Sequence, residues 1–277
     1  MLLKKALSAA AIGLALVSAM PAQASTITNT DGTFSFTGFD WSSNGTAFTT
    51  GFVPVAGATF QLEAFTLAVT LKNGPFDILG LKLDSNADGV SAGAGFYEYT
   101  LHLTLQETVD SCTSGGGSTA CTFTINSGAY DIFYDTTPDA NALAGSLGTG
   151  YLDGIKVISG SIFPQSGGTF TVAGTGGSGI TAILGSVDFT NLAFINPALT
   201  STVAGTTLQF GTLTTNNYVS PGGFNGVAFG TEAGGTFVFQ ADANQSFAVP
   251  EPASLALFGL AILAGGAASR RRIKDKK

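Results

Sequence analysis

The central part of this 277-residue sequence is almost free of positive charge. Of the 11 lysines and arginines, only Lys72, Lys82 and Lys156 lie between Ser25 and Val249, whereas 16 of the 18 acids do, which gives this part a net charge near −13. Nucleic-acid binding needs clustered Lys and Arg to displace counterions. The lack of cations therefore excludes a nucleic-acid partner and leaves divalent cations and polycationic surfaces as partners of opposite charge.

Residues that most often carry catalysis or sugar binding are also scarce. Histidine and tryptophan occur once each, as His102 and Trp41, so a Ser-His-Asp enzyme would have to use His102. Four acids could converge across strands for glycoside hydrolysis, although an acidic protein carries such residues on its surface in any case: Asp131, Asp135, Asp139 and Asp153. We therefore expect neither catalysis nor a required cofactor.

The N-terminus has the form of a secretory signal. Two lysines precede an apolar run from Ala6 to Ala19, and the residues up to Ala24 have the small-x-small form that signal peptidase accepts. We predict that residues 1–24 are removed by cleavage between Ala24 and Ser25. The rest of the chain then enters an exported, oxidising compartment.

A second apolar segment lies near the C-terminus. Residues 253–269 carry no charge, and as a helix they would extend about 25 Å, slightly less than the hydrocarbon core of a membrane. The cluster that follows favours the cytoplasmic side and acts as a basic stop over residues 270–277, beginning with Arg270, Arg271 and Arg272. We predict a single transmembrane helix, with the bulk of the chain on the other side of the membrane.

The stretch Val249-Pro250-Glu251-Pro252 stands directly before this helix. Its two prolines keep the backbone extended and prevent the helix from continuing upstream, so a processing enzyme can bind the stretch in extended form. A plain membrane anchor would need only the apolar run and the basic stop. It would not account for the two prolines.

Taken in this order, the Pro-Glu-Pro stretch, the apolar helix and the Arg-rich end resemble the tail of the PEP-CTERM proteins, a family of exported bacterial proteins. The resemblance covers residues 248–277. It implies that an exosortase, a membrane-embedded cysteine transpeptidase, recognises Val249, Pro250, Glu251 and Pro252 as a sorting motif and removes the tail. The membrane anchor would then be transient, and the body would pass to the cell surface or extracellular matrix.

The body, residues 25–247, is expected to be one all-β domain. Gly, Thr, Ser, Phe and Val dominate it, and from Tyr97 to Gln106 apolar and polar residues alternate with a period of two, which is typical of a strand with one buried face. Between Thr59 and Leu71 the phase of this alternation changes at Ala64-Phe65, which predicts a bulge. Gly-rich turns separate further strand-like runs, so we predict an antiparallel β-sandwich or jelly-roll-like body.

Two short features of the body point to bonds that would stabilise it. Cys112 and Cys121 flank an eight-residue loop of Gly, Ser, Thr and Ala, and in an oxidising compartment they are expected to form a disulfide. Asp84, Asn86 and Asp88, followed by Gly89, place oxygen side chains at every second position, as in the first half of a calcium loop. The acid that would complete such a loop is missing, so calcium and a plain Asp/Asn/Gly turn are both retained.

The sequence thus predicts an exported, non-catalytic surface or matrix protein with a role in adhesion, flocculation or biofilm structure. The body is loosely similar to flocculation-associated PEP-CTERM members. Its expected partners are signal peptidase, an exosortase, and extracellular polysaccharide or other cell-surface components. The alternative is a carbohydrate-binding or glycoside-hydrolysing β-sandwich that uses the same export route.

Overall fold

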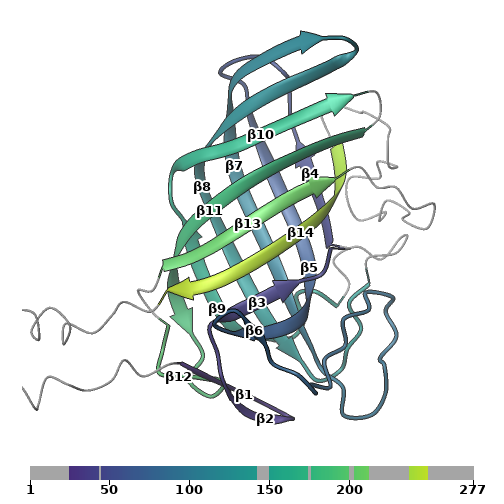
Figure 1. Cartoon of the computed structure of the whole chain (residues 1–277), viewed down its shortest axis with the longest axis vertical. Coiled ribbons are helices and arrows are strands. Elements are labelled where there is room, and N and C mark those ends of the chain that lie inside the picture. The colour runs from purple at the N-terminus through teal and green to yellow at the C-terminus, as the bar shows by residue number, and fades with distance from the viewer. Residues whose placement is uncertain are drawn as a thin grey trace, which may run out of the picture. The chain divides into compact units, whose positions relative to one another are not determined.

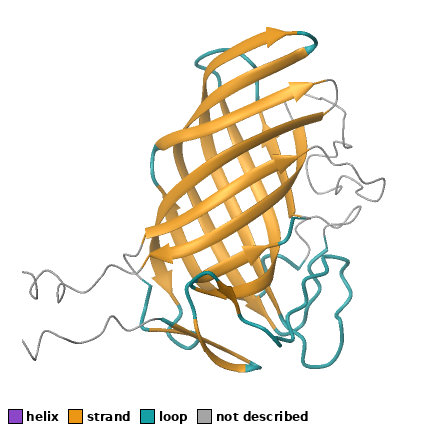
Figure 2. Cartoon of the chain, viewed as in Figure 1, coloured by secondary structure: helices purple, strands orange, loops and turns teal. Residues whose placement is uncertain are grey.

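The regular structure of the described residues consists of strands, as Figure 2 shows. The structure is a computed structural model and describes residues 25–43, 45–141, 150–173, 176–199, 203–211 and 237–248. The predicted signal peptide and the predicted C-terminal helix lie outside these residues. Within the described ranges, no helix has the length and apolar character needed to cross a membrane.

The body unit, Ser25–Ala248, contains strands of very different lengths. In chain order they are β1 (Thr26–Asn29), β2 (Gly32–Ser35), β3 (Gly38–Trp41), β4 (Gly45–Thr50), β5 (Thr59–Asn73), β6 (Phe76–Asp77), β7 (Glu98–Gly115), β8 (Ser118–Asp135), β9 (Ile155–Ile162), β10 (Gln165–Ala173), β11 (Gly176–Thr190), β12 (Ile195–Asn196), β13 (Val203–Gly211) and β14 (Phe237–Ala248).

Eleven of these strands form one antiparallel sheet that closes on itself. The order runs β10-β11-β13-β14-β3-β5-β7-β8-β9, with β4 placed between β14 and β5, and with the two-residue strand β6 paired with β5 alone. Two further pairings, β10 with β8 and β11 with β9, join the ends of this order. In Figure 1, β10, β11, β13 and β14 cross in front of β5, β7 and β8. Closure leaves the described strands of this sheet, apart from the short β6, without a free edge, which protects them from pairing with other chains.

The all-β, antiparallel class predicted from the sequence is confirmed. Two walls pack face to face across a common core, as the layers of a sandwich do, but here they are continuous along both sides. Strands β12, β1 and β2 pair in this order and form a separate three-stranded sheet. Its Ile27 and Ile195 are fully buried and belong to the same core cluster.

Strand β7 follows the period-two pattern from Leu101 to Val109. Leu101, Leu103 and Leu105 are buried, while the residues between them are partly or fully exposed. The strand continues to Gly115, well past the predicted end at Gln106. Gly116 and Gly117, both with positive φ, then form a two-residue turn into β8, so the predicted loose loop is a tight hairpin.

The predicted bulge at Ala64-Phe65 is wrong. Strand β5 pairs with β7 in unbroken register from Thr59↔Thr108 to Leu67↔Thr100. Up to Leu67 the apolar pattern changes phase because the outer face of β5 is covered as well, and the register of β5 against β3 shifts only further along, between Ala68 and Thr70. There Phe65 and Leu67 pack with Phe48, Ala140 and Tyr151 in a second apolar cluster.

Close approach of two strands depends on Gly160 in β9. A Cβ at this position would collide with the Ser186 carbonyl oxygen of β11 and would lie 2.5 Å from the Tyr130 ring of β8. We expect Gly160→Ala to lower the free energy of unfolding by about 1–3 kcal/mol, because overpacking forces the strands apart. Denaturant unfolding of the full chain measures this. Gly115→Ala is the matched control, since no atom lies within 4 Å of a Cβ there.

Candidate functional site

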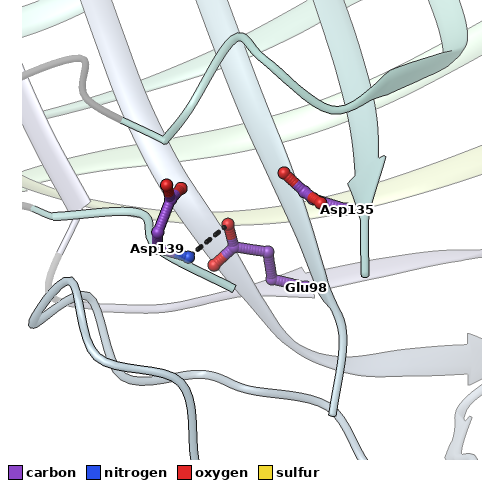
Figure 3. A group of neighbouring side chains, drawn as sticks. All are labelled: Glu98, Asp135 and Asp139. Atoms are coloured by element: carbon purple, nitrogen blue, oxygen red, sulfur yellow. Dashed lines mark hydrogen bonds between the residues drawn. The ribbon is translucent and has the colours of Figure 1, made fainter. Parts of the chain in front are cut away.

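Three acids meet at one end of the sheet. Glu98 begins β7, Asp135 ends β8 as its cross-strand partner, and Asp139 follows in the next loop. One carboxylate oxygen of each lies within 4.8 Å of the others. Figure 3 shows the three side chains together, with a hydrogen bond from the backbone N–H of Asp139 to the carboxylate of Glu98. We call these three residues the acidic cluster.

Burial dominates the electrostatics of the acidic cluster. Glu98 is only 1% exposed, and its Oε1 accepts hydrogen bonds of 3.2 Å from the backbone N–H groups of Asp139 and Ala140. Loss of hydration still raises the pKa of Glu98 to about 8, despite these two donors. Burial, together with the nearby charges of Asp153 and Asp135, also raises the pKa of Asp139.

The geometry of the acidic cluster suits two kinds of chemistry. Three carboxylates within reach of one point can hold a hard cation such as calcium. Alternatively, a protonated acid beside an ionised one is the arrangement that glycoside hydrolysis uses. The backbone bonds to Glu98 also have a structural effect, because they fasten the loop at Asp139 and Ala140 to the start of β7.

The four acids considered from the sequence are divided between different places. Asp135 and Asp139 belong to the acidic cluster, and Asp153 is near enough to act on Asp139. Asp131 is not part of the cluster and forms an ion pair with Lys156, with Oδ1 2.9 Å from Nζ. Glu98, which completes the cluster, was not anticipated from the sequence.

The predicted calcium loop is held by its own backbone. The two carboxylate oxygens of Asp84 accept bonds from the N–H groups of Asn86 and Ala92, and Asp88 accepts one from Val90 and one from the Asn86 side chain. These bonds are those of an Asp/Asn/Gly turn. Calcium at Asp84, Asn86 and Asp88 stays a prediction, and binding there would have to replace them.

His102 lies on the outer face of β7. Its Nε2 is 2.6 Å from Oε1 of Glu63, and its ring stacks on Phe65 with centroids 4.6 Å apart. The letters Gly-x-Ser-x-Gly occur at residues 89–93, which sequence reasoning overlooked, but Ser91 is in a loop and bonds to the Gly93 carbonyl. That loop is not the strand-to-helix turn on which a nucleophilic serine is normally exposed.

The structure joins Cys112 and Cys121 by a disulfide between cross-strand partners of the β7–β8 hairpin. Replacing both cysteines by serine should lower the free energy of unfolding by about 2–3 kcal/mol, because the unfolded chain regains the freedom of the short loop. Urea unfolding of the oxidised full chain checks this value. The same serine variant measured with reductant is the control, since its stability should not depend on reductant.

Both ends of the body are held by hydrogen bonds and burial next to the predicted processing signals. Ser25, beside the predicted signal cleavage after Ala24, is buried, and its carbonyl accepts a bond from Phe36 N–H. At the other end, Phe247 is buried against Phe36 and Phe39, and its N–H bonds to the Thr37 carbonyl. Ala24, Val249 to Pro252 and Arg270 to Arg272 lie outside the described residues.

Comparison with known proteins gives one finding. Residues 248–272 match the PEP-CTERM protein-sorting motif. No curated protein and no solved structure matches the chain. The motif marks the chain as an exported protein whose membrane-anchored C-terminal signal is processed by an exosortase.

Proposed function

We propose that this protein is a non-catalytic component of the cell surface or extracellular matrix, delivered through its sorting tail, and that its body serves adhesion, flocculation or biofilm structure. Signal peptidase would act first, between Ala24 and Ser25, and the exosortase second, at Val249 to Pro252. The membrane anchor would then be transient.

The observation that carries this proposal is where the body ends. Strand β14 pairs with β13 as far as Ala248, and the sorting motif begins at that same residue. The last strand of the closed sheet therefore leads into the motif without an intervening linker. Such an arrangement suits a body that is already folded when the tail is processed.

The body has properties that suit a passive surface module. Among the described residues its long strands close into a ring, its β7–β8 hairpin carries a disulfide, and its excess of acids gives a strong negative charge. Like charges keep such bodies apart at low salt, whereas divalent cations can bridge them. Adhesion that depends on divalent cations is the expected form of the body's activity.

An assay of cell aggregation tests the proposal. Cells that make the full chain should aggregate in millimolar calcium, and cells lacking the chain should not. Adding a chelator should disperse the aggregates. A chain with Pro250, Glu251 and Pro252 replaced by alanine is the matched control, because its body is intact but is not delivered. Aggregation that is the same in all three strains would contradict the proposal.

The alternative, a protein that binds or hydrolyses carbohydrate, is favoured by the acidic cluster alone. Against it, the single tryptophan, Trp41, and the tyrosines that the structure describes are buried, so none of these rings offers a flat platform for a sugar. Incubating the purified chain with a panel of polysaccharides separates the two functions. Released sugar that disappears in Glu98→Gln, or specific retention on one polysaccharide, would favour the alternative.

A further inference from the structure

A cavity lies between the two walls of the closed sheet, at the end that carries the disulfide. Side chains from separate strands and loops line it, among them Phe52, Phe60, Phe123 and Phe170. Phe60 contacts Phe52 and Phe123 edge to face, with ring centroids 5.3 Å apart in both pairs. The cavity has a volume of about 30 Å³. That is room for about two water molecules or a group of similar size.

One charged residue, Glu107, lines this aromatic cavity. It is 3% exposed, and it faces inward because it continues the alternation of Leu103 and Leu105 along β7. Its Oε1 lies against Gly167 of β10, where an added Cβ would be 3.0 Å away. Within the described part of the chain, no hydrogen bond and no ion pair to the Glu107 carboxyl contributes to its pKa.

The other deeply buried acids are treated differently. Glu98 receives two backbone N–H bonds and Asp84 also receives two, so their oxygens are partnered although they lie out of water. A buried carboxyl without partners is costly unless it holds a proton or meets a cation. Burial alone raises the pKa of Glu107 to about 8. A cation that entered the aromatic cavity would therefore favour the ionised form of Glu107.

The body itself has no cation to place there. Its three lysines are engaged or directed elsewhere: Lys72 pairs with Asp40 and Asp77, Lys156 pairs with Asp131, and Lys82 lies beside Gly95. Its single histidine, His102, is bonded to Glu63 on the outer face. A cationic partner for Glu107 would therefore come from outside the body.

We propose that the cavity around Glu107 is a binding site for a small organic ammonium ion. The carboxylate would accept the N–H bonds of the ion, and the phenylalanine rings would contact its charge and its methyl groups. Aromatic faces attract ammonium ions more strongly when they are shielded from water, and the four phenylalanine rings here are buried. The size of the cavity restricts the ligand to an ion such as methylammonium.

Binding has a defined proton balance. At pH 7 the empty site holds Glu107 mainly as the neutral acid, since burial has raised its pKa to about 8. When the ammonium ion enters with its charge intact, the carboxyl proton leaves to the buffer and a carboxylate–ammonium pair remains. Binding should therefore release about one proton for each ion bound at pH 7. No covalent bond is made or broken apart from this O–H bond.

Calorimetric titration of the full chain in nonionic detergent with methylammonium chloride tests the proposal. Buffers of different ionisation enthalpy report the proton release. We expect saturable binding with proton release in the natural chain. Binding should be lost in Glu107→Gln, and unchanged in Glu63→Gln, which removes a carboxylate from the outer face. Gly167→Ala, which crowds the Glu107 oxygen but keeps its charge, should weaken binding by about tenfold or more.

Two neutral or inorganic probes complete the design. Methanol and potassium chloride should bind at least about tenfold more weakly than methylammonium, because methanol has no charge and the potassium ion has no N–H donors. The thermal unfolding temperature of Glu107→Gln shows that this variant is folded. The proposal is overturned if methylammonium does not saturate, if Glu107→Gln binds it as well as the natural chain does, or if methanol binds equally tightly.

Discussion

Replacing Pro250, Glu251 and Pro252 together by alanine is expected to leave the whole chain in the inner membrane, with Lys277 still present. Alanine permits the predicted helix 253–269 to continue upstream, so the extended stretch in front of the membrane is lost. The amount of surface-delivered protein should fall to background while the total amount of chain stays unchanged. Fractionation of cells, followed by mass measurement of the chain in each fraction, checks this.

A substitution just outside the motif is the matched control. Ser254→Ala lies two residues past Pro252 and changes neither the prolines nor the basic stop. It should be delivered like the natural chain. If the triple variant reached the surface in normal amount and without its tail, the sorting motif would not be the feature that the processing enzyme reads.

The stability of the body is expected to fall as the pH rises from 5 to 8.5. In the folded chain the pKa values of Glu98 and Glu107 are raised to about 8, from an ordinary value of 4.5. Between these values the folded chain holds protons that the unfolded chain releases. The stabilising effect is therefore complete below about pH 4.5 and is lost as the pH passes 8. Each unit of pKa shift corresponds to about 1.4 kcal/mol, so the loss is several kcal/mol.

Thermal unfolding at a series of pH values, with a chelator and in amine-free buffers, measures this dependence. The variant with Glu98→Gln and Glu107→Gln keeps the shapes of both side chains but cannot ionise, so its stability should change far less over the same range. Glu63→Gln, on the outer face, should retain the dependence of the natural chain. A natural chain that is as stable or more stable at pH 8.5 than at pH 5 would show that folding does not raise the pKa values of these two acids.

Several features of the fold could be predicted from residue patterns. The period-two alternation in β7 indicates a strand, and the Gly-rich turns indicate an all-β body. Glu107 could also have been predicted as a buried acid, because it lies two residues after Leu105 and therefore on the same apolar face of β7. The strand was expected to end at Gln106, and the only acid on that face was therefore missed.

Other features depend on contacts that the local pattern does not contain. Closure of the sheet requires β8 to pair with β10 and β11 with β9, and each of these pairings contains a shift in register. The acidic cluster requires the loop after β8 to bring Asp139 back to Glu98 at the start of β7. Residues from distant segments bury the outer face of β5, so this face is apolar too. In the sequence, apolar residues on both faces give the same change of phase as a bulge.

The central claim is that the C-terminal motif is a signal that is removed during sorting. The intact mass of the protein recovered from the cell surface tests this most directly, in cells with and without the exosortase. The account predicts a surface species that begins at Ser25 and ends near Pro252 with an added group, and its absence from exosortase-deficient cells. A surface species that still ends at Lys277, or normal delivery without the exosortase, would contradict it.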